Sequence, residues 1–405
     1  MARSPDADLT DEAAYELSRR AVVRLSGYGL GGALTLPFLP DAAAAEDGAG
    51  IVKPLPPELF VPRGTNAETR WEAMLGQGYL TPVDRFFVRN HVATPRIDAR
   101  AWRLRIWGDG LRGGPVEFTY DALRRLPAET LTARIECTGN ARSLFTTQQG
   151  QRVSGTAWGL GAVGVARWRG VRLSVLLERA GISRRAVDVM PRGLDADYVD
   201  GGVNLGRVRR PLPVAKARKD VLVAYEMNGR PLPPDHGFPA RLVVPDWVGV
   251  ASVKWLGDIE VSTTPLASPW NTQYYRLFGP DYPPEGSAPL TRMNTKSAFE
   301  LPWDGEIPRD TRVLHGRSWS GNGRVTSVAV SADGGATWRR ARPHGPSLAR
   351  AWTRWTIPWR PPGPGRHELL ARAADETGAA QPDTAPYNTL GYLFGAVARH
   401  PVTVK

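Results

Sequence analysis

Cys137 is the only cysteine among the 405 residues of the chain. It follows residues 131–135, whose β-branched and apolar side chains predict a short strand. Residues 138–140, Thr-Gly-Asn, predict a turn after it, because glycine and asparagine tolerate a positive φ. A sulfur at the end of a strand, beside a glycine turn, is expected to point into a site. Arg134 and Arg142 flank it, and nearby cations favour the thiolate over the thiol.

A lone cysteine in this setting has two interpretations. It can be buried and pack as a small apolar side chain. As a thiolate it is a soft, strongly donating ligand that suits a redox-active metal. One cysteine cannot supply the usual zinc or iron–sulfur site by itself. A metal at Cys137 would therefore need further ligands.

Five short runs of sequence, in a fixed order along the chain, favour the second interpretation. They are residues 86–91 (Phe-Phe-Val-Arg-Asn-His), 137–142 (Cys-Thr-Gly-Asn-Ala-Arg), 224–229 (Ala-Tyr-Glu-Met-Asn-Gly), 236–241 (His-Gly-Phe-Pro-Ala-Arg) and 253–257 (Val-Lys-Trp-Leu-Gly). Together they resemble the sulfite oxidase family, whose members are molybdenum enzymes that hold a molybdopterin cofactor. The resemblance extends over most of the chain.

The resemblance implies the residues of a reaction site. Cys137 would be a ligand of molybdenum, and two dithiolene sulfurs of the pterin would make one protein sulfur sufficient. Arg89 and Arg142 match the arginines of the family's substrate pocket, where fixed cations hold an oxyanion and the charge that develops on it. Tyr275 matches the family's active-site tyrosine, and its spacing from Trp270 favours it over its neighbour.

The resemblance also implies a cofactor-binding set. The phosphate of the pterin needs cationic and backbone donors. Asp195 matches an acidic position that bonds the pterin ring system. The other implied binding residues are Phe87, Val88, Arg89, Asn90, His91, His236, Arg241, Ser252, Val253 and Lys254. Taken singly, His236 could be an ordinary loop residue and Lys254 a solvated strand residue. Their arrangement in the two runs that contain them favours the binding roles.

The composition is that of a soluble globular protein with a basic surface. The formal net charge is +12, and 42% of the residues are hydrophobic and 23% charged. A lysine-rich run or a nucleic-acid-binding motif is lacking, so nucleic acid is not an expected partner. A basic pocket for an anionic substrate and a phosphate-bearing cofactor fits the charge better. No stretch is long and apolar enough to span a bilayer.

Residues 1–48 resemble an export signal. Arg19 and Arg20 form a twin-arginine pattern, residues 25–39 are weakly apolar, and residues 42–45 offer an Ala-x-Ala processing site. The alternative is an amphipathic surface helix with a chance arginine pair. The signal predicts a protein that is folded with its cofactor before export, and then resides in the periplasm.

Residues 49–285 predict a mixed α+β cofactor-binding domain with few helices. Strands are expected at residues 85–92, 102–107, 188–190, 221–225, 242–244 and 253–256, and helices at 119–126 and 171–180. Thr119 is a candidate N-cap, and Asn228-Gly229 is typical of a hairpin turn. The glycine-rich residues 157–168 do not match a dinucleotide-binding loop. Within them, Trp158 is expected to wall the active site or to pack beside it.

Residues 286–405 predict an all-β domain. Short strands are expected at residues 312–316, 325–330, 338–340, 352–359 and 367–373, with a hairpin turn at 331–335. Strands at this spacing suggest an immunoglobulin-like sandwich. The family resemblance implies the same fold and a role in forming a homodimer.

These observations predict an exported molybdenum enzyme that oxidises sulfite or a carrier-bound sulfane sulfur by oxygen-atom transfer. Electrons would pass to a separate c-type cytochrome, because the chain has no Cys-x-x-Cys-His haem site. A reductase on the same cofactor, for example for a sulfoxide, and a cofactor-free binding module remain the alternatives. The chain has Leu390 where animal sulfite oxidases place a further arginine, and residues 293–297 also look bacterial. Both features indicate the branch with sulfite dehydrogenases and the sulfane dehydrogenase of the thiosulfate-oxidising system.

Overall fold

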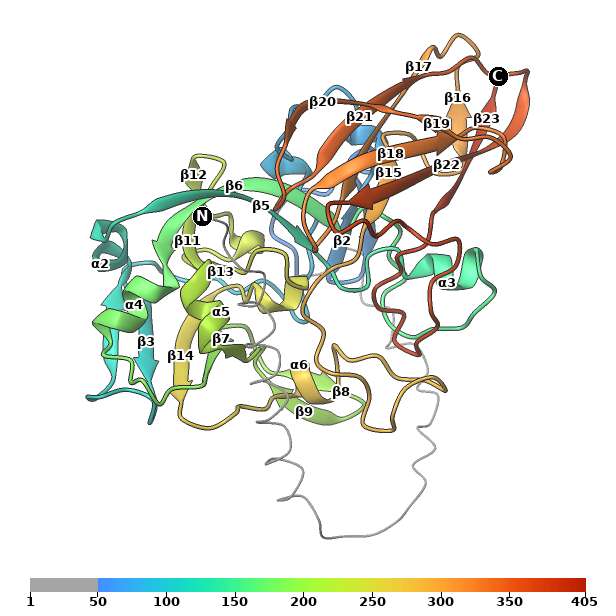
Figure 1. Ribbon diagram of the computed structural model, residues 1–405. Coiled ribbons are helices and arrows are strands. Elements are labelled where there is room, and N and C mark those ends of the chain that lie inside the picture. Colours follow the sequence, from blue (N-terminus) through green and yellow to red (C-terminus); the bar gives the residue numbers. More distant parts are fainter. Residues whose placement is uncertain (1–49) are drawn as a thin grey trace, which may run out of the picture. The chain divides into compact units, whose positions relative to one another are not determined.

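The computed structural model describes residues 50–405, which are built mainly from four larger β-sheets and short helices (Figure 1). The predicted export signal, residues 1–48, lies outside the described residues. No helix in the described part of the chain is long and apolar enough to cross a membrane.

Two of the sheets share one hydrophobic core. The first has the order β10 (Leu212–Pro213), β7 (Asp188–Gly193), β14 (Leu256–Ser262), β3 (Arg103–Trp107) and β4 (Val116–Thr119). The second has the order β12 (Arg230–Pro231), β11 (Leu222–Met227), β6 (Val163–Arg172) and β5 (Glu129–Glu136), with β13 (Arg241–Val243) also paired to β11. Leu104 and Ile259 from the first sheet and Val223 and Leu242 from the second are buried together. Burial of these apolar side chains stabilises the packing of the two sheets.

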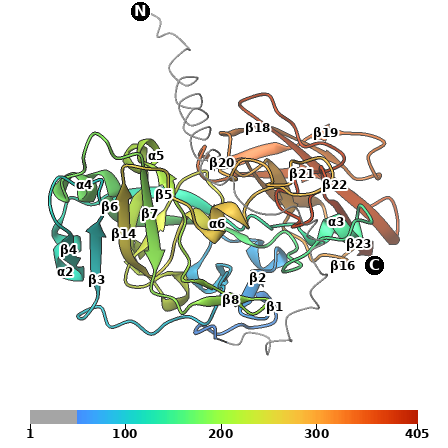
Figure 2. The ribbon, with the colours of Figure 1, turned by 90° about the horizontal axis from the view of Figure 1, so that it is seen from below.

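The remaining elements of this region are short. The helices are α2 (Tyr120–Arg125), α3 (Ser143–Thr147), α4 (Leu173–Arg179), α5 (Val214–Lys219) and α6 (Pro269–Thr272), and the 3-10 turns are η3 (Glu72–Met74), η4 (Val83–Arg85), η5 (Pro234–His236) and η6 (Gly249–Ala251). Two hairpins pair β1 (Phe60–Arg63) with β2 (Asn66–Thr69), and β8 (Tyr198–Asp200) with β9 (Val203–Gly206). Helices α2 and α4 lie beside β3 in both views (Figures 1 and 2).

Local sequence signals predicted several of these elements correctly. The Thr119 hydroxyl accepts a hydrogen bond from the Ala122 N–H at 3.0 Å, as expected of the N-cap of α2. Asn228 and Gly229 have φ values of 52° and 82° and connect β11 to β12, which confirms the hairpin turn. Gly181, with φ 78°, follows α4 as the predicted stop.

Two predicted strands are wrong. Residues 85–92 contain only an isolated bridge, between Val88 and Ala67. Phe86, Phe87 and Val88 are all buried, the first two in one cluster and the third in another, so the backbone turns instead of alternating. Residues 253–255 are likewise not a strand, because Trp255 has φ 51° and β14 begins only at Leu256.

The C-terminal residues form the predicted two-sheet sandwich. One sheet has the order β15 (Lys296–Phe299), β17 (Val313–Trp319), β21 (Thr353–Pro358) and β20 (Arg342–Ser347). The other has the order β16 (Gly305–Ile307), β23 (Arg399–Val404), β22 (Gly365–Asp375), β18 (Val325–Ser331) and β19 (Arg339–Arg340). Trp355 from the first sheet and Leu369 and Val402 from the second are buried in the core between them. The prediction of an α+β domain followed by an all-β sandwich is therefore confirmed. The predicted boundary at residues 285 and 286 falls in irregular chain between α6 and β15, and its position stays a prediction.

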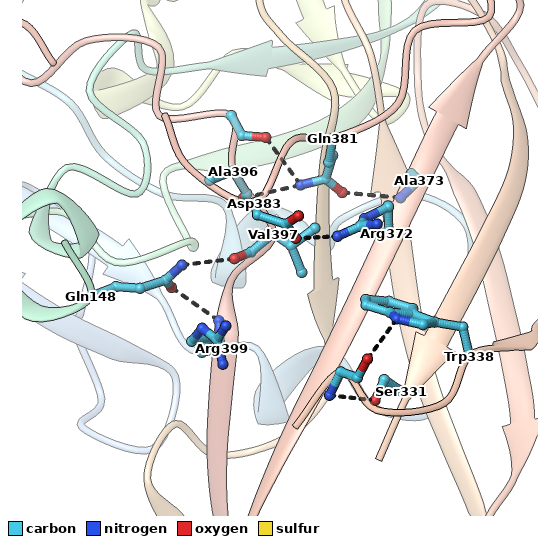
Figure 3. Close-up of polar contacts among 12 residues, drawn as sticks. Gln148, Ser331, Trp338, Arg372, Ala373, Gln381, Asp383, Ala396, Val397 and Arg399 are labelled. Atoms are coloured by element: carbon cyan, nitrogen blue, oxygen red, sulfur yellow. Dashed lines mark hydrogen bonds and ion pairs between the residues drawn. The ribbon is translucent and has the colours of Figure 1, made fainter. Parts of the chain in front are cut away.

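The sandwich is joined to the segment after the cysteine by a paired amide contact (Figure 3). Gln148, directly after α3, donates from Nε2 to the Val397 carbonyl at 2.9 Å. Its Oε1 accepts from the Arg399 N–H at 3.0 Å, at the start of β23. Gln381 binds backbone groups of Ala373 and Ala396 in the same region. The segment that follows the cysteine loop is thus tied to the sandwich through hydrogen bonds between the Gln148 amide and backbone groups.

Candidate active site

Cys137 directly follows β5 and begins a tight loop whose shape depends on Asn140. The Asn140 N–H donates to the Cys137 carbonyl at 2.9 Å. The Asn140 side chain donates from Nδ2 to Glu136 Oε1 at 3.0 Å and accepts from the Ala162 N–H at 2.9 Å. Asn140 is fully buried, so all of these bonds form away from water. They hold the cysteine loop between the end of β5 and the residues before β6.

The backbone of this loop differs from the prediction. A positive φ was expected at Gly139 or Asn140, but it occurs at Ala141, with φ 74°. The absence of a side chain at Gly139 leaves room for Arg142, because a Cβ there would lie 2.5 Å from Cζ of Arg142. The Arg142 guanidinium therefore lies directly against the backbone of the cysteine loop.

The fold brings almost all the predicted site residues to one cleft. The residues that line it are Phe86, Phe87, Arg89, Asn90, His91, Ile135, Cys137, Thr138, Asp195, Val208, Asp235, His236, Arg241, Gly249, Val250, Ser252, Val253, Lys254, Trp255 and Tyr275. The empty space in the cleft, including its open mouth, is about 710 Å³.

Val88 and Arg142 are the predicted site residues that do not line this cleft. Val88 is fully buried and exchanges backbone hydrogen bonds with Ala67 at 2.9 Å. Arg142 donates from Nε to the Leu390 carbonyl and from Nη1 to the Thr156 carbonyl, each at 2.8 Å. Its guanidinium lies 5.2 Å from the centre of the Tyr392 ring.

Several cleft residues were missed from the sequence. Thr138 and Trp255 belong to matched runs and could have been found from them. Val208, Gly249 and Val250 lie in segments without a recognisable pattern. Trp158, for which two positions were expected, packs beside the site: it is buried and lies edge-on to Phe87.

The cleft gathers basic side chains whose hydrogen bonds go to uncharged acceptors. The Lys254 ammonium donates to Asn90 Oδ1 and, at 2.8 Å, to the Asp235 carbonyl. The Arg241 guanidinium donates to the carbonyls of His236 and Ser252, at 3.1 and 2.9 Å. These acceptors are all uncharged, so no ion pair ties up either side chain and both remain available to an anionic ligand. Such an arrangement is suited to a phosphate or another anion.

The Asp235 carboxylate, which lies near Lys254, makes its hydrogen bonds with other groups. Asp235 accepts hydrogen bonds from the Val52 and Lys53 N–H groups, at 3.0 and 2.8 Å, and from the Thr94 hydroxyl at 2.5 Å. These bonds fasten η5, which carries His236, to the N-terminal part of the described chain. Asp235 thus positions the turn that carries His236.

Burial disfavours the charged forms of His236, Arg241 and Lys254. Burial, together with the nearby Lys53, Lys254 and Arg241, lowers the pKa of His236 well below its usual value. Burial lowers the pKa of Arg241 to about 9, and burial and Arg241 lower the pKa of Lys254 well below its usual value. A bound anion would reverse these shifts because it favours the protonated forms.

His91 is held as a neutral imidazole. Burial, with Arg89 and Lys254 nearby, lowers the pKa of His91 well below its usual value. Its Nε2 accepts a hydrogen bond from the Trp270 indole N–H at 3.0 Å, and its ring lies edge-on to Tyr198. The other ring nitrogen, Nδ1, therefore carries the proton and can act as a donor.

Four buried polar atoms on the cleft have no hydrogen-bond partner within residues 50–405. They are Arg89 Nη1, Thr138 Oγ1, Asp195 Oδ1 and His236 Nε2. An unsatisfied buried polar group costs about 1–3 kcal/mol, so four around one cleft indicate a polar ligand. The set combines donors with a carboxylate acceptor, as a pterin with a phosphate group requires. Among the described residues, no three histidine, cysteine or acidic side chains come together as a metal site. The family resemblance implies that sulfur atoms of the cofactor would be the further ligands of a metal at Cys137.

The two neighbouring tyrosines occupy different environments. Tyr275 lines the cleft and is buried, with φ 58°. The Tyr274 hydroxyl donates to the Asp200 carboxylate instead. The structure thus places Tyr275, the residue favoured by the sequence, at the candidate site.

Comparisons with known proteins agree with this geometry. An oxidoreductase molybdopterin binding domain matches residues 91–270, and a Mo-co oxidoreductase dimerisation domain matches residues 288–405. Sulfite oxidase of Gallus gallus is 37% identical over 351 residues, which cover 82% of this chain and 74% of that protein. The chain belongs to the sulfite oxidase family.

Further relatives and one solved structure are similar to the chain. Mitochondrial sulfite oxidase of Homo sapiens is 39% identical over 363 residues, 85% of this chain and 65% of that protein. The chain spans 64–65% of the length of the mammalian relatives it matches. The crystal structure of the sulfane dehydrogenase SoxCD from Paracoccus pantotrophus superimposes with a TM-score of 0.71 at 29% identity, covering 92% of both chains.

The matched domain assigns molybdenum-molybdopterin as the cofactor, and the residues of the cleft fit it. Cys137 would hold the metal, and His236, Arg241 and Lys254 would hold the phosphate. Asp195 would accept from the amino and amide groups of the pterin, and burial raises the pKa of Asp195 to about 6. When bound, the cofactor supplies two-electron redox chemistry and oxygen-atom transfer, while the protein binds and orients the reactants.

Replacing Lys254 should change how the stability of the cofactor-free protein depends on pH. Because the pKa of Lys254 is lowered, the unfolded chain, with its lysine near 10.5, binds a proton that the folded protein does not. The wild-type protein should therefore lose stability as the pH falls below about 10, and Lys254→Met should lose less. Melting temperatures across this range, with and without inorganic phosphate, measure the difference.

Lys219→Met, at the exposed end of α5, is the matched control and should follow the wild type. Phosphate should raise the melting temperature of the wild type more than that of Lys254→Met, because the anion favours the protonated lysine. Equal pH slopes for the wild type and Lys254→Met would contradict this electrostatic account.

Proposed function

We propose that this protein oxidises a small sulfur compound, either sulfite or a sulfane sulfur on a carrier. The observation that carries the proposal is the position of Arg89 and Tyr275 beside Cys137 on the cleft that would hold the cofactor. Arg89 Nη1 has no hydrogen-bond partner in the described part of the chain, so it is available to an anion. The relatives named as sulfite oxidases and as a sulfane dehydrogenase support the choice of substrate class.

In this proposal each side chain has a defined part. The Arg89 guanidinium binds the anion, and the Tyr275 hydroxyl donates a hydrogen bond to one of its oxygens. Sulfite and water yield sulfate, two protons and two electrons. The electrons pass to a separate c-type cytochrome, and the sandwich domain joins two copies of the chain into a homodimer.

Metal analysis followed by a steady-state assay tests this function. We expect about one molybdenum per chain, and reduction of cytochrome c on addition of sulfite. A protein without molybdenum would support a binding module instead. A protein with molybdenum that reduces a sulfoxide with an artificial donor, but oxidises neither sulfite nor a sulfane, would support the reductase alternative.

The residue at position 390 bears on which of the two substrates is preferred. The Leu390 side chain packs in the apolar cluster of Tyr275 and Tyr392, where an arginine would bring a further positive charge. Leu390→Arg should lower the KM for sulfite by about tenfold, because a charge-assisted hydrogen bond is worth about 1.5–3 kcal/mol. The same variant should impair oxidation of a carrier-bound sulfane, since an arginine side chain at the pocket wall is longer and more polar than leucine.

Leu390→Met serves as the matched apolar control and should keep both activities. If the KM for sulfite does not change in Leu390→Arg, position 390 does not influence the anion site and the argument for a widened substrate pocket fails.

We also propose that the twin-arginine pattern directs export to the periplasm. Replacing Arg19 and Arg20 together by lysine should leave the precursor inside the cell, because this pathway recognises the arginine pair. Fractionation of cells that express the wild type and the double variant measures this. Normally processed variant in the periplasm would indicate a different route.

A further inference from the structure

Tyr392, from the C-terminal part of the chain, contacts two residues that the family resemblance assigns to the substrate pocket. Its ring is stacked on Tyr275, with centroids 5.2 Å apart and 9° between the planes. The Arg142 guanidinium lies 5.2 Å from the centre of the same ring. Tyr392 is buried, so it makes these contacts out of water. It is not among the residues that line the cleft.

The backbone around Tyr392 holds its ring in place. The Tyr392 N–H donates to Asn388 Oδ1 at 2.8 Å, and Asn388 Nδ2 donates to the Tyr392 carbonyl at 2.9 Å. The next residue, Leu393, donates its N–H to the carbonyl of Thr138 at 3.0 Å. The segment is therefore clamped by a buried asparagine and attached directly to the cysteine loop.

Tyr275 needs such support. Its φ of 58° is a conformation that bulky side chains rarely adopt unless the surroundings impose it. Its backbone carbonyl accepts from the Leu290 N–H at 2.8 Å. Its hydroxyl has no hydrogen-bond partner among residues 50–405, so packing alone sets the direction of the ring. Among the described residues, the aromatic ring that packs against the Tyr275 ring is that of Tyr392.

We propose that Tyr392 is a positioning residue that orients the Tyr275 phenol toward the substrate anion. It acts through the face of its ring, not through its hydroxyl, and does not touch the substrate. The sandwich region thereby contributes to the geometry of the active site. This inference rests on the proposed function, because it gives the Tyr275 hydroxyl a role in binding the sulfur anion.

Two substitutions of Tyr392 in the molybdenum-loaded protein separate the ring from the hydroxyl. Tyr392→Leu removes the stacked ring. A stacked aromatic pair is worth about 0.5–1.5 kcal/mol, so this variant should raise the KM for sulfite and weaken sulfate binding by about three- to tenfold. Tyr392→Phe keeps the flat ring and should restore both values to within about twofold of the wild type. Calorimetry measures sulfate binding independently of turnover.

The orientation of Tyr275 has a readout that does not depend on the substrate. Nitration of Tyr275 by tetranitromethane, followed by mass spectrometry of its peptide, should be faster in Tyr392→Leu than in Tyr392→Phe. Tyr274 in the same peptide gives an internal reference. Equal nitration of Tyr275 in the two variants would overturn the inference.

The kinetic outcomes are equally decisive. If Tyr392→Phe is as impaired as Tyr392→Leu, the hydroxyl and not the ring is responsible, and the inference is wrong. An unchanged KM and sulfate affinity in Tyr392→Leu also overturn it. A wild-type protein that oxidises neither sulfite nor a sulfane refutes the proposed function, whereas the nitration comparison still tests the contact between the two rings.

Discussion

Replacing Cys137 by serine should remove nearly all turnover and leave the protein folded with its pterin bound. A serine hydroxyl is a poor replacement for a soft thiolate as a ligand of molybdenum. The side chains that would bind the phosphate, His236, Arg241 and Lys254, are separate from the cysteine loop and remain in place. Activity, melting temperature and the amount of pterin released on denaturation measure the three parts of this expectation.

Ser143→Ala is a suitable control, because Ser143 lies in the same segment, at the start of α3, and outside the cleft. It should keep wild-type activity and cofactor content. If Cys137→Ser retains wild-type turnover, the cysteine is not a ligand of the metal and the assignment of the site fails.

Replacing Lys296 by methionine should cost about 3–5 kcal/mol of unfolding free energy, because it breaks a buried ion pair and leaves a charged partner behind. Lys296 Nζ lies 2.9 Å from Glu136 Oε1, and the two side chains are 1% and 0% exposed. Glu136 also accepts from the indole N–H of Trp319 at 2.9 Å, and Arg134 Nε lies 3.7 Å from it. Denaturant unfolding curves of the wild type and the variant measure the loss.

Two further variants test whether the stability loss in Lys296→Met comes from the burial of the ion pair. The double variant Lys296→Met with Glu136→Gln should recover part of the loss, since the Glu136 carboxylate is then no longer buried without the Lys296 ammonium. Lys405→Met removes an ion pair with Glu306 whose side chains are 66% and 60% exposed, and it should cost less than about 1 kcal/mol. A loss below that value for Lys296→Met as well would show that the pair is dispensable. Because Glu136 precedes Cys137 directly, the pair also links the sandwich to the cysteine loop.

Short-range features of the fold were predictable because they depend on neighbours along the chain. The N-cap at Thr119 needs only a hydroxyl and the N–H three residues later. The turn at Asn228-Gly229 needs only residues that tolerate a positive φ. The strand errors at residues 85–92 and 253–255 have the opposite cause. There the backbone follows buried side chains that pack against distant parts of the chain, and no local pattern contains that information.

The sequence by itself determined the chemistry available to this protein: one soft ligand at Cys137, cations for a phosphate, and an arginine and a tyrosine for an anion. These properties belong to residue types and to short runs such as Cys-Thr-Gly-Asn. Only the tertiary structure decided which of them meet. Arg89, His236 and Tyr275 reach one cleft because two sheets and their loops bring segments far apart in sequence together. The structure also placed Lys296 and Tyr392 of the C-terminal region against Glu136 and Tyr275, since such contacts arise from packing between domains and leave no periodicity or motif in the chain.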